Sequence, residues 1–145
     1  MTAAARELIP HALRMCLLDT VESWDDTQVR CTTASHRDPL NPLRSGAQLA
    51  ALHLCEYGAQ ATAVHGGLLA RREGGASAAA GMLVALREVE LAVDRVDDIE
   101  GVLTVTASMK VASAGGCLYD FEISAGGRAL ARGRVSVIFA GAGQA

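Results

Sequence analysis

Hydrophobic residues follow two different spacings along this chain. Between Ser45 and Leu69 the chain is dense in alanine, leucine and glycine, and no other stretch is long enough to form one central helix. Elsewhere apolar and polar residues tend to alternate with the period of a half-buried strand, most strictly in VLTVTASMKVA. The pattern predicts a short helix or turn over Thr2–Ile9 and six strands: Met15–Trp24, Thr27–Thr33, Met82–Ala92, Val102–Ala112, Cys117–Ser124 and Arg128–Phe139.

The order of these elements indicates the fold class. Two strands precede the helix and four follow it, and glycine-containing turns join the last three strands as antiparallel neighbours. One long helix against a six-stranded, largely antiparallel sheet is an α+β arrangement. Because the helix is almost entirely apolar, we expect the sheet to curl around it, as in the hot-dog fold.

The start of the helix is marked by a capping signature. Ser45 is followed three residues later by Gln48, which predicts a first turn near Gly46. The free N–H groups of that turn would point into the preceding loop, ASHRDPLNPLR, and could hold an anion or a carbonyl oxygen.

Three polar side chains share one stripe of the predicted helix. His53, Glu56 and Gln60 recur at spacings of three and four. A stripe of this kind commonly faces solvent. In so apolar a helix, however, a buried carboxylate is costly unless it is paired or takes part in chemistry, so Glu56 is the first functional candidate.

Composition excludes several classes of function. The chain has 145 residues, as expected for one domain, and its net charge of −3 and five aromatic residues argue against nucleic-acid binding. No apolar run approaches the ~18–20 residues needed to span a membrane. Four cysteines without a CxxC pair indicate buried thiols in a reducing cytoplasm, and no cysteine and histidine spacing favours a metal site. We expect no cofactor.

Several motifs, in order, resemble one enzyme family. LIPHALRMCLLDTV and NPLRSGAQLAALHLCEYGAQ are similar to the opening segment and the helix of hot-dog 3-hydroxyacyl-(acyl carrier protein) dehydratases, and REVELAVDRVDDIEG and GRALARGRVSVIF are similar to their later strands. The chain most resembles a short, divergent branch of predicted dehydratases of the aryl-polyene pathway type. The resemblance covers nearly the whole sequence.

The resemblance assigns roles to individual residues. The family's helix carboxylate falls on Glu56 and its following glutamine on Gln60, whereas PLRS stands where the family's loop has Gly-His-Phe-Pro. Three histidines are candidates to replace the missing loop histidine as base. They are His36 first, then His11, which alternatively anchors the amino-terminal segment, and His53, which alternatively orients Glu56.

These assignments leave more than one function open. The first is a dehydratase with Glu56 as acid, His36 as base and helix-start N–H groups near Gly46 polarising the thioester carbonyl. The second is a hot-dog thioesterase, and the third is a non-catalytic subunit that pairs with an active dehydratase. The substrate would be an acyl thioester on acyl carrier protein or coenzyme A, and we expect Gly46, His53, Gln60 and Arg44 to bind it. Arg37, Arg44, Arg71 and Arg72 are candidate contacts to an acidic carrier. We expect a homodimer or a larger multiple of dimers, or a heterodimer with a second dehydratase.

Overall fold

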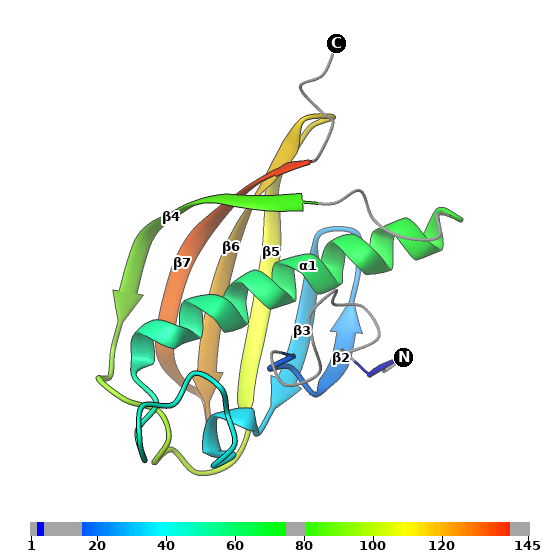
Figure 1. The fold of residues 1–145 in the computed structure, drawn as a ribbon. Helices are drawn as coiled ribbons and strands as arrows, with labels where there is room; N and C mark the ends of the chain where they lie inside the picture. The colour runs from blue at the N-terminus through cyan, green and yellow to red at the C-terminus, as the bar shows by residue number, and fades with distance from the viewer. Residues whose placement is uncertain (1–2, 5–15, 75–80, 140–145) are drawn as a thin grey trace.

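A curved antiparallel sheet wraps around one long helix (Figure 1). The computed structural model describes residues 3–4, 16–74 and 81–139. Its helical elements are the 3-10 helices η3 (Ser35–Arg37) and η4 (Ala51–His53) and the α-helix α1 (Leu54–Arg72). Its strands are β1 (Ala3–Ala4), β2 (Thr20–Trp24), β3 (Gln28–Thr33), β4 (Gly81–Leu91), β5 (Leu103–Ala112), β6 (Gly116–Ala125) and β7 (Arg128–Phe139).

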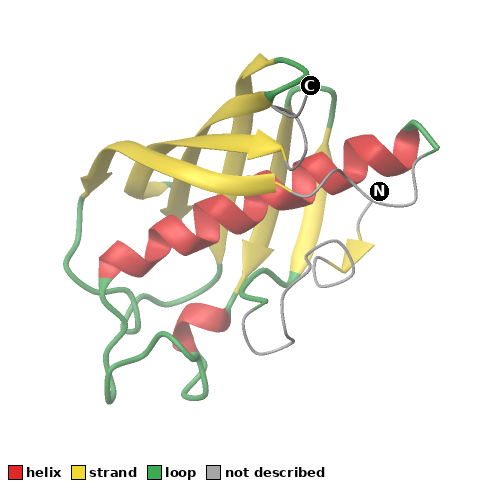
Figure 2. Cartoon of the chain, turned by 45° about the horizontal axis from the view of Figure 1, so that its top comes forward, coloured by secondary structure: helices red, strands yellow, loops and turns green. Residues whose placement is uncertain are grey.

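The sheet confirms the predicted α+β hot-dog arrangement. Its strand order is β1-β2-β3-β5-β6-β7-β4, and every neighbouring pair is antiparallel. The six predicted strands are all present, and α1 lies across the concave face of the sheet (Figure 2). The sheet has one strand that the sequence did not predict. This is β1, where Ala3 pairs with Val21 although a helix or turn was expected there. The other residues of that predicted element lie outside the described residues.

The predicted start of the helix was wrong by nine residues. Ser45 and Gln48 instead close a tight turn, in which the Ser45 N–H donates to the Gln48 carbonyl at 2.8 Å and the Gln48 N–H donates back at 3.1 Å. Gly46 in this turn has a φ of +62°, which a helix does not accommodate. The residues that follow are bonded to the β4–β5 loop, since Val96 N–H donates to Leu49 O and Ala51 N–H donates to Asp94 O, both at 2.9 Å. Because of this pairing, the α-helix begins only at Leu54.

The strand predicted over Met15–Trp24 is also shorter than expected. In the structure this strand, β2, begins at Thr20. Residues 16–19 do not form a strand. The backbone of Leu17 is bonded to side chains, with its N–H donating to Gln60 and its carbonyl accepting from Thr33 and Ser35. The segment therefore belongs to the surroundings of the helix rather than to the sheet.

The helix packs on the sheet through one buried face, which includes Leu54, Tyr57, Ala61 and Val64. Opposite it, the inward side chains of β5, β6 and β7 complete the core, as the alternation in the sequence predicts. The helix comes close to the sheet at Gly58, where an added Cβ would lie 2.4 Å from the ring of Phe121. The rotation of α1 is thereby fixed, and Glu56 is turned away from the sheet.

Candidate functional site

Glu56 lies in the first turn of α1, at the border between the buried and the exposed face of the helix. Its neighbours Tyr57 and Leu54 are fully buried against the sheet, whereas Glu56 is half-buried and Ala63, two turns later, is exposed. The carboxylate atom Oε2 accepts a hydrogen bond from Gln60 Nε2 at 3.3 Å. Glu56 is thus held in place while remaining partly accessible.

Gln60 links Glu56 to the amino-terminal segment. The side chain is 1% exposed, and its Oε1 accepts a hydrogen bond from the Leu17 N–H at 2.8 Å. The resemblance grouped Gln60 with substrate-binding residues, and the structure gives it a bond to Glu56 on one side and to the backbone on the other. A buried amide with both ends engaged is well ordered.

A second polar network continues from Leu17 toward the pre-helix loop. The Leu17 carbonyl accepts from Ser35 Oγ at 2.6 Å, and Ser35 Oγ lies 2.9 Å from Tyr57 Oη. Asn41 Nδ2 donates to the same Tyr57 oxygen at 3.1 Å. Because Ser35 donates its single proton to Leu17, the Tyr57 hydroxyl donates to Ser35. Sequence reasoning missed these residues, since the contact at Leu17 is made by backbone atoms and leaves no side-chain signal.

His36 is buried inside the loop that precedes the helix. Its relative exposure is 0%, and its Nε2 lies 2.9 Å from the Ile99 carbonyl, so Nε2 carries the proton and donates it. Burial lowers the pKa of His36, and the nearby Arg37 and Arg44 add to that effect although the bond to Ile99 opposes it. The ring is therefore neutral near pH 7. Its Nδ1 has no hydrogen-bond partner in the described part of the chain, so neither ring nitrogen contacts Glu56.

Arg44 organises the same loop. Its guanidinium donates from Nη1 to the Ala47 carbonyl at 2.9 Å and from Nη2 to the His36 carbonyl at 3.3 Å. Leu49 N–H, in the stretch that leads into η4, donates to Asp97 Oδ1 at 2.8 Å, and Arg95 also bonds this carboxylate. These bonds hold the pKa of Asp97 far below its usual range.

The other predicted site residues are not gathered around Glu56. Gly46 lies in the turn that precedes Leu49, eight residues before α1, so its N–H is not part of a helix start. His53 is half-buried at the end of η4, one turn before Glu56. His11 lies outside the described residues. Of the predicted set, the structure joins only Glu56 to Gln60 and Arg44 to His36 by hydrogen bonds among the described residues.

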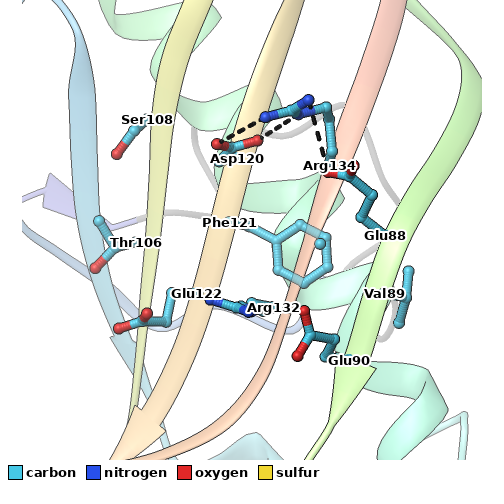
Figure 3. A pocket seen from close by; sticks show the side chains of 11 residues that line it. Glu88, Val89, Glu90, Thr106, Ser108, Asp120, Phe121, Glu122, Arg132 and Arg134 are labelled. Atoms are coloured by element: carbon cyan, nitrogen blue, oxygen red, sulfur yellow. Dashed lines mark hydrogen bonds and ion pairs between the residues drawn. The ribbon is translucent and has the colours of Figure 1, made fainter.

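A cavity lies on the other side of the sheet. It has a volume of about 800 Å³ and is lined by charged side chains from β4, β6 and β7, as Figure 3 shows. Arg134 donates to Asp120 at 2.8 Å and lies 3.6 Å from Glu88, and Arg132 donates to Glu90 at 2.7 Å. Because these side chains face away from α1, this cavity does not contain Glu56, and none of the predicted site residues lines it.

Residues 16–74 and 81–139 contain neither a metal-binding group nor a helix that could span a membrane. No three histidine, cysteine, aspartate or glutamate side chains come together there as a possible metal-binding group. No helix in these ranges has the length and apolar composition needed to cross a bilayer.

This chain is similar to a known protein family and to a solved structure of a dehydratase complex. A family model described as ApeP-like, ApeP dehydratase, matches residues 3–143. A chain of the dehydratase heterocomplex ApeI:P from Xenorhabdus doucetiae is 26% identical, with a TM-score of 0.85 over 94% of this chain and 91% of that chain. No match was found among curated protein sequences.

Two more distant solved structures share the fold. A hypothetical thioesterase protein with coenzyme A from Streptococcus pneumoniae is 16% identical, with a TM-score of 0.58 over 82% of this chain and 83% of that chain. AziG from S. sahachiroi is 22% identical, with a TM-score of 0.59 over 91% of this chain and 97% of that chain. At these identities the likeness extends to the fold alone.

Proposed function

This chain belongs to the ApeP-like dehydratase family, and from that premise we propose that it takes part in dehydrating a 3-hydroxyacyl group carried as a thioester on an acyl carrier protein. The expected pathway makes a fatty-acid or polyketide-like lipid of the aryl-polyene type. The observation that carries the proposal is Glu56, a half-buried carboxylate that Gln60 orients on the only α-helix of the described residues.

The reaction needs one base and one acid. The base takes a proton from C2 of the acyl chain, the released electron pair forms the C2–C3 double bond, and the C3–O bond breaks. The departing oxygen takes a proton from the acid and leaves as water, so that the product is an enoyl thioester. We assign the acid role to Glu56, because its carboxyl group is partly accessible and its Oε2 is fixed by a hydrogen bond.

The base is assigned to a second subunit. His36 remains a candidate within the chain, but its burial and the bond from Nε2 to Ile99 favour a role in holding the loop. His53 lies one turn before Glu56 and is suited to orient it. A histidine brought by a partner to the exposed side of Glu56 would complete the acid and base pair.

The open edge of the sheet supports such a partner. β4 is the last strand of the order, and within the described part of the chain it pairs with β7 alone, which leaves its outer backbone groups for a further strand. Leu86 and Leu91 on β4 are each 40% exposed. We propose that two subunits pair through β4. The similarity to a chain of a dehydratase heterocomplex favours a second, different dehydratase as that partner.

The carrier would dock near the start of the helix. Of the arginines considered, Arg44 is engaged in the loop, and Arg72 is bonded to Asp26 and lies over Trp24. Arg37 is exposed at the end of η3, with no ion pair to a described residue, and is our candidate contact to an acidic carrier. We also place the protein in the cytoplasm, which agrees with four cysteines that form no disulfide.

The proposed function is tested by identifying the product and the partner. The purified chain, alone and co-expressed with the hot-dog dehydratases encoded beside it, is given a 3-hydroxyacyl thioester of acyl carrier protein. We expect a conjugated enoyl product, absorbing in the ultraviolet, with the higher rate in the mixture that forms a stable heterodimer. Release of free thiol without enoyl product would instead identify a thioesterase. Equal rates with and without every partner would contradict the assignment of the base to a second subunit.

A further inference from the structure

We propose that two copies of this chain pack through the outer faces of their sheets, with Arg30 of each copy paired with Glu122 of the other. The outer face is the side of the sheet that faces away from α1, where the cavity of Figure 3 lies. This contact uses side chains on the face of the sheet, whereas the proposed pairing through β4 uses backbone groups at its edge. In a heterodimer that holds one copy of this chain, the contact would join two heterodimers.

The strand register places Arg30 and Glu122 symmetrically about β5. Arg30 on β3 lies beside Thr106 on β5, and Thr106 lies beside Glu122 on β6. Neighbouring strands are about 4.8 Å apart, so the two charged residues lie at equal distances on either side of β5. All three side chains are on the outer face, because the residues that precede and follow them along each strand are buried.

Arg30 and Glu122 are opposite charges that are not used within the described part of the chain. Both side chains are exposed, and neither makes an ion pair with a described residue. The arginines of β7 differ, because each of them donates to a carboxylate of a neighbouring strand, as in the bond from Arg134 to Asp120 at 2.8 Å. Arg30 and Glu122 are therefore available to a partner on this face.

The cavity makes the two halves of this face different in charge. It extends over β5, β6, β7 and β4, has a volume of about 800 Å³, and is lined by four carboxylates and two arginines (Figure 3). Its lining therefore has an excess of negative charge. On the other side of β5, strand β3 presents Gln28 and Arg30, which are both exposed. A face that is hollow and negative on one side of β5, and has an exposed arginine on the other, is complementary to a second copy of itself.

A two-fold axis along β5 brings the two different halves together. It places β3 of each copy over β6 of the other, so that the same surface is used by both copies. Arg30 then meets Glu122 of the second copy, and the symmetry forms this ion pair twice. The outward side chains of β5 at the axis, Thr106 and Ser108, are small and uncharged, so these positions bring no like charges together.

The next row of residues agrees with the same axis. Gln28 on β3 lies beside Ser108 on β5, and Ser108 lies beside Asp120 on β6. The hydrogen bond from Arg134, together with the charge of Lys110, lowers the pKa of Asp120 although burial opposes it, so the carboxylate is ionised near pH 7. Across the axis, the Gln28 amide of one copy can donate to this carboxylate in the other. Two successive rows therefore match.

Charge-reversed variants test the contact directly. Arg30→Glu and Glu122→Arg each put like charges against one another in both ion pairs. In an equimolar mixture of the two variants, the changed position 30 of one copy meets the changed position 122 of the other, and the unchanged Arg30 meets the unchanged Glu122. Both pairs are then attractive again. Arg128→Glu is the matched control, because it reverses an exposed arginine at the β6–β7 turn, outside the two rows.

Assembly is measured by sedimentation equilibrium on the full chain, alone and with its partner dehydratase, and folding is checked by circular dichroism. We expect wild type to associate beyond the β4-paired dimer. Each single variant should raise the dissociation constant of this association by about 100-fold or more, and the mixture should return to within about threefold of wild type. Arg128→Glu should match wild type. A wild-type protein that stays at the β4-paired dimer at high micromolar concentration, single variants that associate as wild type does, or a mixture of folded variants that remains dissociated overturns the proposal.

A cross-linking readout does not depend on the charged residues. The two Thr106 side chains meet at the axis, and packed sheets lie about 10 Å apart, so copies with Thr106→Cys should be joined by a bismaleimide of that span. Arg128→Cys is the control, and wild type accounts for Cys16 and Cys117, which are partly exposed. A Thr106→Cys protein that is cross-linked no more than these controls overturns the proposal. Neither readout uses a substrate, so both decide the contact whether or not the chain takes part in dehydration.

Discussion

Removing the Tyr119 hydroxyl group should destabilise the protein and change how its stability depends on pH. Tyr119 Oη lies 2.5 Å from His65 Nδ1, and His65 Nε2 lies 2.8 Å from the Asp25 carbonyl. Since a carbonyl only accepts, Nε2 carries the proton and Nδ1 accepts from Tyr119. These bonds fasten the second half of α1 to β6 and to the β2–β3 turn. Tyr119→Phe keeps the ring and leaves Nδ1 without a donor.

The size of the effect follows from burial. His65 is 0% exposed and Tyr119 is 2% exposed, so water does not replace the lost bond. An unsatisfied buried acceptor costs about 1–3 kcal/mol, which is a large share of a typical stability of about 5–15 kcal/mol. With a loss of about 2 kcal/mol and a urea dependence of about 2 kcal/mol per molar, the middle of each range, the unfolding midpoint should fall by roughly 1 M.

The pH dependence has a definite sign. Burial lowers the pKa of His65 in the folded protein below its ordinary value of 6.5, despite the opposing bond to Asp25. Between these two pKa values the unfolded chain binds a proton that the folded chain does not. The stabilisation is therefore complete above pH 6.5 and is lost as the pH falls toward the folded pKa. Without Tyr119 as donor, the neutral ring is less favoured, so the loss should be smaller in Tyr119→Phe.

Urea unfolding followed by the fluorescence of the single tryptophan, Trp24, measures both effects at fixed protein concentration. His36 also has a lowered pKa, so the comparison needs a control that leaves His65 alone. Tyr57→Phe serves, because Tyr57 is bonded to Ser35 and Asn41 instead. Tyr119→Phe within about 0.5 kcal/mol of wild type, or with a pH dependence identical to that of Tyr57→Phe, would show that Tyr119 does not supply a stabilising hydrogen bond to His65.

Three further predictions use other contacts. Gly58→Ala should lower the free energy of unfolding by about 1–3 kcal/mol in the same urea assay, because the new Cβ would lie 2.4 Å from the Phe121 ring. Gly66→Ala is the control: its new Cβ would meet no neighbouring atom within 4 Å, so the substitution should be neutral or stabilising. Asp97→Ala should lower the melting temperature and speed proteolysis of the pre-helix loop, because the Leu49 N–H loses its acceptor and Arg95 loses its carboxylate partner; unchanged proteolysis would contradict this. Leu86→Arg at the β4 edge should shift the assembly toward monomer in light scattering, and an unchanged mass would count against pairing through β4.

The strands were predictable because their pattern is local. In β5 the residues Leu103, Val105 and Ala107 are fully buried and the intervening residues are not, which is the period of two visible in the sequence. The start of α1 was not predictable in the same way. Ser45 and Gln48 have the sequence of a helix cap, but the stretch from Leu49 is bonded to a loop more than forty residues away, and this contact overrides the local signal.

The candidate site was partly predictable for a similar reason. Glu56 and Gln60 are four residues apart on one helix, so their contact follows from helix geometry. The orientation of the His36 ring, in contrast, depends on its hydrogen bond to the Ile99 carbonyl, and that of the Gln60 amide on the hydrogen bond from the Leu17 N–H. Backbone groups are present at every residue, so no pattern of side chains marks these two as partners.

In the proposed mechanism, Glu56 supplies the proton for dehydration. The most direct measurement is the turnover of Glu56→Gln on a 3-hydroxyacyl thioester of acyl carrier protein, in the same assembly as wild type. The substitution keeps the size of the side chain and removes the exchangeable acid proton. We predict a fall in kcat of roughly 10²–10⁴ with little change in KM. A folded Glu56→Gln protein that forms the enoyl product at the wild-type rate would rule out Glu56 as the acid.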